Sequence, residues 1–238
     1  MTTGGPEDPR PALLPLFAAE AGRRLDAIDA CLAAEDRDFK SLVREAHTVR
    51  GSAAVLGLEQ VAEEAGRLES AFARARSEPS ELDAREVRPT LRRIRTLLAA
   101  VQAPAEETGG AAQEAVAPAR LVLCVEDSDV SARVVTRILE TRGVAVVIAG
   151  SGEDAGRLAV EHRPDVVIVD LHLPDMSGED VVRRLAARPE TRSVPVVVMT
   201  GGADERRFEA LAALGVRGVL EKPFTPDELA AAVEAALA

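Results

Sequence analysis

The second half of the chain alternates short apolar runs with helical stretches, and this alternation restricts the possible folds more than any other feature of the sequence. The runs are rich in valine and too short for helices: 121–125, 144–149, 165–170, 194–200 and 216–221. Helical candidates lie between and after them: 128–142, 152–162, 178–188, 204–214 and 226–237. Parallel strands need crossover connections, which helices supply. The sequence therefore predicts an α/β doubly wound domain with a five-stranded parallel sheet over 120–238.

The chain before residue 103 has a different pattern, in which apolar residues recur at helical spacing. It divides into four helical segments with short polar breaks between them: 12–34, 38–56, 58–77 and 82–102. Short connections favour antiparallel neighbours, so the sequence predicts an all-α four-helix bundle over 12–103. Pro89 should kink the fourth segment or mark its true start, because proline lacks a backbone N–H.

Two segments carry too little large apolar surface to build a core. Residues 1–11 are expected to be disordered, and residues 104–119 are rich in Ala, Pro, Gly and Glu, which suits a flexible linker. A flexible chain of that length spans roughly 20–24 Å, from about 5–6 Å times the square root of its length. We therefore expect the two domains of one molecule to be within reach of each other.

Composition argues against several classes of function. The formal net charge is −11, which disfavours binding along nucleic acid, and Trp and Tyr are absent, so neither ring can stack on bases. The sequence has no run of 18 or more apolar residues and no signal-peptide pattern, so membrane insertion is not expected. Cys31 and Cys124 lack metal-ligand spacing and are expected to be ordinary buried thiols. These features favour a soluble cytoplasmic protein.

The second helical segment carries a histidine beside small residues. Its apolar positions form one narrow stripe that should face the core: Leu42, Ala46, Val49, Ala53 and Leu56. His47 points roughly 140° away from the middle of that stripe, and Gly51 shares its face, so we expect His47 to face solvent. An exposed histidine is usually only a solvated residue. Glycine inside a helix costs about 0.5–1 kcal/mol relative to alanine, however, so Gly51 suggests close approach by a partner.

These residues resemble the His-x-x-Lys-Gly motif of histidine-phosphotransfer domains. The matching stretch, His-Thr-Val-Arg-Gly-Ser, begins at His47, and the resemblance extends over the first hundred residues. It implies that the His47 imidazole accepts a phosphoryl group, that a nearby cation favours the charge of that group, and that Gly51 lets the partner approach. Arg50 stands where lysine is usual. Arginine keeps the charge and offers a planar pair of donors to phosphate oxygens, so we expect function to persist.

Acidic residues follow two of the predicted strands in the second half. Glu126 and Asp127 come directly after the first run, and Asp170 ends the third. The carboxyl ends of parallel strands share one edge of a sheet, so these carboxylates should converge there. Their repulsion favours a hard divalent cation, and Mg²⁺ also neutralises phosphate oxygens during transfer. Thr200 and Lys222 lie at two further strand ends, where their hydroxyl and ammonium groups suit phosphoryl oxygens.

This set of residues resembles the receiver domain of response regulators, a flavodoxin-like fold, over 119–238. The matching segments follow the family's order: VED (125–127), DLHLPDMSG (170–178), MTG (199–201) and EKPF (221–224). The resemblance implies that Asp170 accepts the phosphoryl group. It implies Mg²⁺ ligands from Glu126, Asp127, Asp170 and the backbone carbonyl of His172. It also implies that Thr200 and Lys222 bind the phosphoryl oxygens.

Two positions near the end of this motif set need separate comment. The bond between Lys222 and Pro223 could be cis, because X-Pro bonds adopt that isomer far more readily than other peptide bonds. The family often has an aromatic residue three positions before the lysine, where this chain has Val219. We therefore expect an aromatic switch to be absent or muted, with the chemistry at Asp170 unaffected.

The sequence predicts phosphorelay signalling in a two-component system, with phosphoryl groups passing between His47 and Asp170. It shows no nucleotide-binding glycine-rich loop, so the chain is not expected to be an ATP-dependent kinase or other enzyme beyond Mg²⁺-dependent transfer onto its own receiver. The implied partners are a histidine kinase and other receiver or phosphotransfer proteins. An alternative is a phosphorylation-controlled binding module, in which the receiver gates docking by the bundle. A transcription factor is not expected, since no DNA-binding domain follows the receiver in this sequence.

Overall fold

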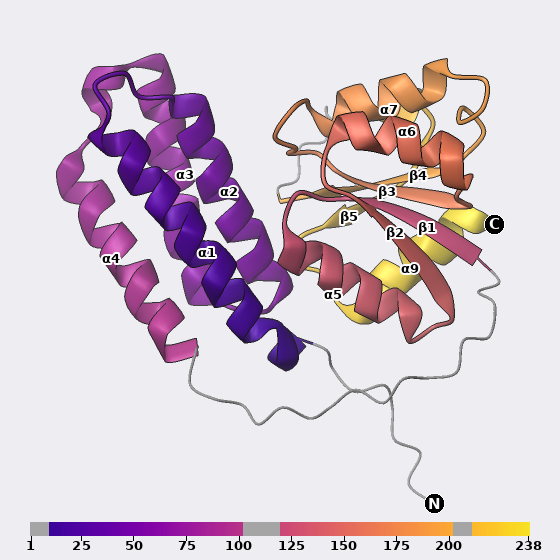
Figure 1. Ribbon diagram of the computed structural model, residues 1–238, viewed down its shortest axis with the longest axis horizontal. Helices are drawn as coiled ribbons and strands as arrows, with labels where there is room; N and C mark the ends of the chain where they lie inside the picture. Colours follow the sequence, from indigo (N-terminus) through magenta and orange to yellow (C-terminus); the bar gives the residue numbers. More distant parts are fainter. Residues whose placement is uncertain (1–9, 102–119, 202–210) are drawn as a thin grey trace, which may run out of the picture. The chain divides into compact units, whose positions relative to one another are not determined.

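The computed structural model of the protein describes residues 10–101, 120–201 and 211–238. These residues form two compact units, a helical one and one built on a sheet (Figure 1). The predicted linker, 104–119, lies outside the described residues, as do residues 1–9 of the predicted disordered terminus. Arg10 and Pro11, which that terminus included, instead begin the first helix.

The helical unit contains the four predicted helices and a short 3₁₀ turn, Pro79–Glu81. Their bounds are α1 Arg10–Ala33, α2 Phe39–Val55, α3 Glu59–Ser77 and α4 Ala84–Val101. The core lies where the apolar stripes of these helices meet, and the predicted stripe on α2 from Leu42 to Leu56 is buried throughout. Full burial of one leucine side chain stabilises a fold by about 1.5–3 kcal/mol. Packing of these stripes therefore holds the bundle together.

Helix α2, which carries His47, has well-defined ends. The Asp38 carboxylate accepts a hydrogen bond from the Ser41 N–H at 3.1 Å and so caps the first turn. The other end stops at Gly57, whose φ of 74° lies in the left-handed region. The N–H groups of Gly57 and Leu58 donate to the carbonyls of Ala54 and Ala53, which satisfies the last turn. These caps fix how far the helix extends on each side of His47.

Of the two outcomes predicted for Pro89, a kink or the true start of the fourth helix, the structure excludes the start. Proline stands inside α4, and the helix already begins at Ala84. The reason is packing, because a stripe at helical spacing is buried on both sides of the proline: Val87, Leu91, Ile94 and Leu98. Burial of that stripe outweighs the hydrogen bond that proline cannot donate.

The second unit is a five-stranded parallel sheet in the order β2-β1-β3-β4-β5. Its strands are β1 Arg120–Val125, β2 Val144–Ala149, β3 Val166–Asp170, β4 Val196–Thr200 and β5 Val216–Glu221. Its helices are α5 Asp129–Glu140, α6 Gly152–His162, α7 Gly178–Ala187 and α9 Pro226–Leu237. Helices α5 and α9 cover one face of the sheet, and α6 and α7 cover the other (Figure 1). This is the predicted doubly wound fold, with the flavodoxin-like strand order.

Burial explains why the apolar runs form this sheet. Every residue of β3 and β4 is buried, as expected for central strands covered on both faces. Most of the predicted helix 204–214 lies outside the described residues. Cys124 is buried as predicted, but Cys31 is only half-buried, because it lies in the last turns of α1 outside the buried stripe of that helix. Among the described helices, none has both the length and the apolar composition that spanning a membrane requires.

The helix caps predicted for this unit are present. Ser128 caps α5 by accepting from the Ser131 N–H at 3.2 Å, and Gly143 follows the helix with φ of 75°. Thr225 and Glu228 form a reciprocal capping box on α9. The Glu228 N–H donates to the Thr225 hydroxyl at 3.2 Å, while the Glu228 carboxylate accepts from the Thr225 N–H at 2.7 Å. These bonds also lower the pKa of the Glu228 carboxyl.

We expect Thr225→Ala to lower the free energy of unfolding of the sheet unit by about 1 kcal/mol, because the α9 cap loses its side-chain acceptor. Thr225→Ser keeps that acceptor and should remain close to the parent protein. Urea unfolding followed by circular dichroism measures both variants. Equal stability of the Ala and Ser variants would show that the capping box contributes nothing.

Candidate functional site

The candidate site lies at the carboxyl edge of the sheet, where four neighbouring strands end. In the strand register Val125 of β1 pairs with Val169 of β3, so the residue after each, Glu126 and Asp170, stands at the same edge. Asp170 in turn pairs with Met199 of β4, which Thr200 follows. The parallel register thus brings these polar residues to one edge, as the sequence predicts.

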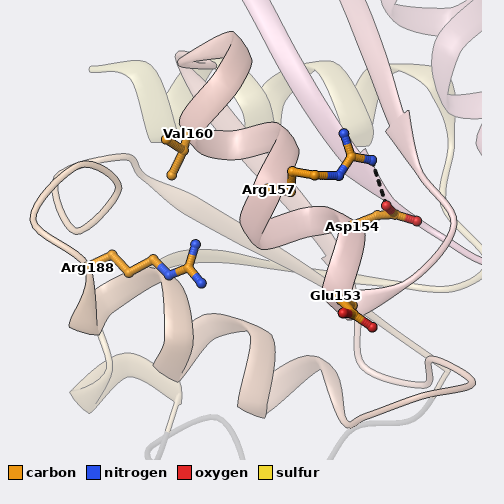
Figure 2. A pocket seen from close by; sticks show the side chains of 5 residues that line it. All are labelled: Glu153, Asp154, Arg157, Val160 and Arg188. Carbon is orange, nitrogen blue, oxygen red and sulfur yellow. Dashed lines mark hydrogen bonds and ion pairs between the residues drawn. The ribbon is translucent and has the colours of Figure 1, made fainter.

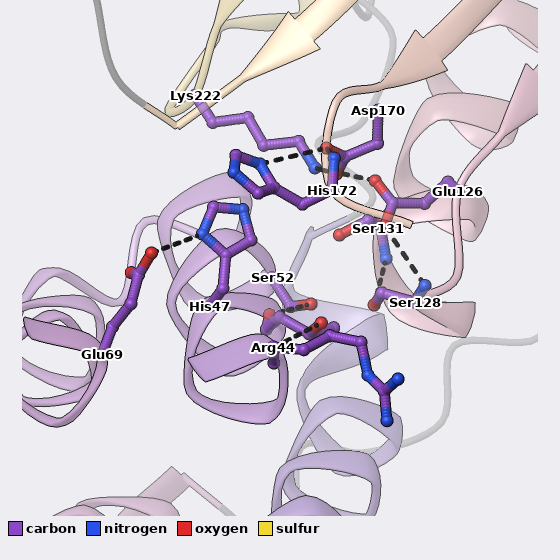
Figure 3. A network of polar contacts seen from close by, with 11 residues as sticks. Arg44, His47, Ser52, Glu69, Glu126, Ser128, Ser131, Asp170, His172 and Lys222 are labelled. Carbon is purple, nitrogen blue, oxygen red and sulfur yellow. Dashed lines mark hydrogen bonds and ion pairs between the residues drawn. The ribbon is translucent and has the colours of Figure 1, made fainter. Parts of the chain in front are cut away.

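Lys222 binds the two buried carboxylates directly (Figure 3). Its ammonium nitrogen Nζ donates to Oε2 of Glu126 at 2.7 Å and to Oδ2 of Asp170 at 2.6 Å. The side chains of all three are at most 5% exposed. Buried charges are tolerated only when they are paired and hydrogen-bonded, and here one cation meets two carboxylates. When both acids are ionised, the pocket therefore holds more negative than positive charge.

The pKa shifts in the pocket reflect this imbalance. Burial raises the pKa of Glu126 to about 8; the nearby Asp170 and Asp127 add to that rise, and Lys222 opposes it. Burial disfavours the charge on Lys222, but Asp170 and Glu126 outweigh burial and raise the pKa of the ammonium above its usual range. Lys222 therefore stays protonated in the pocket, and its single positive charge is shared by the two carboxylates.

The loop after β3 folds back over Asp170. The His172 N–H donates to Oδ1 of Asp170 at 2.8 Å, so each carboxylate oxygen of Asp170 has a donor. Gly178, at the start of α7, comes so close that a Cβ there would overlap the carbonyl oxygen of Asp170 and the Cα of Leu171. Only glycine allows this approach. The Nδ1 of the His172 side chain lies 3.9 Å from Oδ1 of Asp170.

Thr200 and Lys222 are joined through the backbone. Thr200 is buried at the end of β4, and its carbonyl accepts a hydrogen bond from the Lys222 N–H at 2.7 Å. The peptide bond between Lys222 and Pro223 is cis, the isomer that the sequence allowed. Val219 is 39% exposed on β5. The structure thus brings Thr200 and Lys222 to the same edge as Asp170.

The acids present fit a hard divalent cation. Glu126 and Asp170 converge on Lys222, and Asp127 is close enough for its charge to raise the pKa of Glu126. Oxygen ligands with surplus negative charge are what Mg²⁺ binds in proteins. The donor set of this pocket therefore agrees with the Mg²⁺ that the sequence predicts.

Within the bundle, His47 contacts a carboxylate of α3 that the sequence pattern did not indicate. Its exposure to solvent stays a prediction. Nδ1 of His47 lies 2.9 Å from Oε1 of Glu69, as Figure 3 shows. Oε2 of Glu69 lies 3.2 Å from the guanidinium of Arg50. One carboxylate therefore connects the candidate histidine with the neighbouring cation.

Small residues accompany this arrangement. Gly51 is buried on α2. On α3, a Cβ at Gly66 would lie 3.3 Å from the Cδ of Arg50, so the stem of Arg50 passes closely over that helix. The contact between His47 and Glu69 could not be predicted from sequence pattern, since the two residues are 22 positions apart on different helices.

Comparison with known proteins finds both domain types. Residues 12–104 match the Hpt domain, and residues 122–234 match the response regulator receiver domain. These two domain types are those of two-component phosphorelay signalling, and neither is a kinase domain.

The second half of the chain is similar to several individual proteins. The transcriptional regulatory protein KdpE of Mycobacterium tuberculosis is 41% identical over 118 residues, which cover 49% of this chain and 50% of KdpE. The polar-differentiation response regulator DivK of Brucella anthropi is 31% identical over 104 residues, which cover 44% of this chain and 85% of DivK. The solved structure of the chemotaxis response regulator CheY4 of Vibrio cholerae is 29% identical and covers 50% of this chain and 98% of CheY4, with a TM-score of 0.48.

The extent of these matches differs between relatives. The chain spans about half the length of KdpE but most of the length of DivK. The strand order and the carboxylates at the strand ends agree with the receiver match. The chain therefore belongs to the response regulator receiver family, and an Hpt domain precedes its receiver domain.

Proposed function

We propose that the protein is a phosphorelay component in which phosphoryl groups pass between a histidine, His47, and an aspartate, Asp170. The observation that carries this proposal is the presence of an Hpt domain and a receiver domain in one chain, with His47 in the first and Asp170 in the second. The domain bounds suggested from the sequence, 12–103 and 120–238, are part of the proposal.

Asp170 is the proposed acceptor on the receiver. Its carboxylate oxygen attacks the phosphorus of a phosphohistidine, the new O–P bond forms as the N–P bond breaks, and the imidazole of the donor leaves. The ammonium of Lys222, already at the Asp170 carboxylate, is placed to bind oxygens of the incoming group. The Thr200 hydroxyl is proposed to bind another of these oxygens. Fixed donors of this kind stabilise the charge that develops during transfer.

Three carboxylates and one carbonyl are proposed to hold Mg²⁺: Glu126, Asp127, Asp170 and the backbone carbonyl of His172. When bound, Mg²⁺ would neutralise the phosphoryl oxygens beside the carboxylates. The buried pair of Glu126 and Asp170 with a single lysine supports this assignment, because their surplus negative charge would otherwise repel a phosphoryl anion.

His47 is the proposed phosphoryl carrier of the bundle. A carboxylate accepts a hydrogen bond and cannot donate one, so the contact with Glu69 favours the imidazole tautomer with its proton on Nδ1. That tautomer leaves the lone pair of Nε2 as the nucleophile. The Glu69 charge also stabilises the positive imidazole ring of a phosphohistidine. Arg50, which contacts Glu69, supplies a cation on the same side of α2.

We expect Glu69→Gln to slow phosphoryl transfer onto His47 by roughly a hundredfold, the lower end of the range for positioned acid–base groups. The Gln carbonyl can still accept from Nδ1, but it lacks the charge that stabilises the cationic ring. Glu63→Gln, on an exposed position of α3, is the matched control. Initial rates from a phosphorylated receiver measure the effect. Equal rates for the two variants would remove Glu69 from the mechanism.

The proposed partners are a histidine kinase, which supplies phosphoryl groups from ATP, and other receiver or phosphotransfer proteins. A time course with a panel of phosphorylated kinases tests this proposal if the label on histidine and on aspartate is followed separately. Repeating the assay at several dilutions distinguishes transfer within one molecule from transfer between molecules. No label on either residue with any kinase or phosphorylated receiver would contradict the proposed function. The alternative, a docking module gated by the receiver, has no support in the family matches.

A further inference from the structure

The loop between β3 and α7, residues 171–177, is attached to the start of α6 by one carboxylate. Oδ1 of Asp175 accepts from the Gly152 N–H at 3.0 Å, and Oδ2 accepts from the Glu153 N–H at 2.9 Å. These are the first two N–H groups of α6, which no carbonyl of the helix can satisfy. The third, that of Asp154, donates to the Ser151 hydroxyl at 3.1 Å. Asp175 therefore completes the cap of a helix to which it does not belong.

Close packing also holds the loop 171–177 against the start of α6, and we call this contact the joint. A Cβ at Gly152 would lie 2.5 Å from Cγ of Met176 and 2.8 Å from Cγ2 of Val181. Met176 belongs to the loop and Val181 to α7, so the start of α6 presses on both. Burial alone would raise the pKa of Asp175, but the backbone N–H groups of Gly152 and Glu153 outweigh it and lower that pKa. The joint thus holds an ionised carboxylate at the positive end of a helix dipole.

Helix α6 is itself held in place on the far side of this joint. It forms, with the end of α7, a pocket of about 470 Å³, which Figure 2 shows with Arg157 and Arg188 at its sides. The guanidinium of Arg188 donates to the carbonyl of Gly156 in α6 at 3.2 Å. This second attachment does not involve the loop, so α6 is held to the end of α7 by a contact that is independent of Asp175.

The other end of the loop is part of the candidate site. His172 follows Asp170 by two residues and donates its N–H to Oδ1 of that side chain. It also forms an antiparallel bridge with Ser177, so the loop folds back on itself between the two. Asp175 lies inside this closed turn. A shift of Asp175 away from α6 would therefore move the backbone of His172.

We propose that Asp175 is a positioning residue for the cation site: by tying the loop to α6, its carboxylate fixes the direction of the His172 carbonyl. The inference rests on the proposed function, because that function assigns this carbonyl to Mg²⁺. Asp175 itself does not contact the cation. It acts on the backbone that carries one ligand, as outer partners of metal ligands do elsewhere.

The test is Mg²⁺ binding to the full-length protein, measured by isothermal titration calorimetry without any phosphodonor. We expect Asp175→Asn to weaken Mg²⁺ binding by roughly tenfold, the lower end of the range for outer partners of metal ligands. Asparagine removes the charge and one acceptor, and its NH₂ group would face an N–H of α6. Asp154→Asn is the matched control, since it removes an equal charge from the first turn of the same helix without touching the loop, and its affinity should be unchanged.

A second variant separates positioning from folding. Gly152→Ala forces α6 away from Met176 and Val181 and should weaken Mg²⁺ binding in the same direction. Circular dichroism identifies which variants are folded at the titration temperature. A loss of stability alone would lower the melting temperature and leave the affinity of the folded protein unchanged. Unchanged affinity in either folded variant would overturn the inference. Failure of the parent protein to bind Mg²⁺ would instead overturn the proposed function.

Discussion

A His47→Gln variant is expected to lose its base-stable phosphoryl label completely after incubation with a phosphorylated receiver. Phosphate on an imidazole nitrogen is stable to base and labile to acid, whereas phosphate on a carboxylate is labile to base. Glutamine has no ring nitrogen to attack phosphorus, so no phosphoryl–nitrogen bond can form there. Its size and polarity should let α2 keep its packing, because position 47 is not part of the apolar stripe from Leu42 to Leu56 that forms the bundle core.

Two measurements make this result interpretable. Circular dichroism should show the same helix content for the variant and the parent protein. An Asp170→Ala variant is the complementary control, since it should keep the base-stable label and lose the base-labile one. Base-stable label on the His47→Gln protein would show that another residue is the carrier.

Removal of Mg²⁺ is expected to abolish labelling of Asp170 by a small phosphodonor such as acetyl phosphate. The donor must bring a phosphoryl anion to a pocket where Lys222 already meets two buried carboxylates. Without a divalent cation, the negative charge of the carboxylates repels the phosphoryl anion that Asp170 must attack. We expect a rate at least roughly a hundredfold lower in EDTA, and full recovery when excess Mg²⁺ is added.

Asp127→Ala should reproduce most of that loss at ordinary Mg²⁺ concentrations, because it removes one proposed ligand. Asp129→Ala is the matched control: the residue is also acidic, lies two positions further on, and is exposed in the first turn of α5. Incorporation of label by each folded variant is compared at several Mg²⁺ concentrations. Full labelling in EDTA, or equal labelling of the two variants, would contradict the role of the cation.

The sequence predicted those features that depend on local pattern. Valine-rich runs too short for helices became strands, and the acids directly after them reached one edge because parallel strands end together. The helical stripe on α2 was buried as expected. The motif residues Glu126, Asp170 and Lys222 lie together in the structure, although their roles in phosphoryl transfer stay predictions.

The features that sequence reasoning missed depend on contacts between elements. Periodicity on α2 alone could not show that Glu69 of α3 lies against His47. The sequence pattern did not single out Asp175, because its two partners begin a helix 22 and 23 positions earlier in the chain. Pro89 left open a kink or a helix start, and the start is excluded because apolar residues on both sides of the proline are buried in one helix.

The sequence separation of the residues that meet in each candidate site also has a consequence for folding kinetics. The contact between Lys222 and Glu126 joins residues 96 positions apart, whereas the contact between His47 and Glu69 joins residues 22 apart. Contacts between distant residues form slowly, because a long loop must close first. As a ribosome releases the chain, the histidine centre can therefore assemble while the acid pocket still lacks its lysine. A nascent chain should acquire its two candidate phosphoryl sites in sequence order, and the acidic pocket should remain without its buried cation until β5 has joined the sheet.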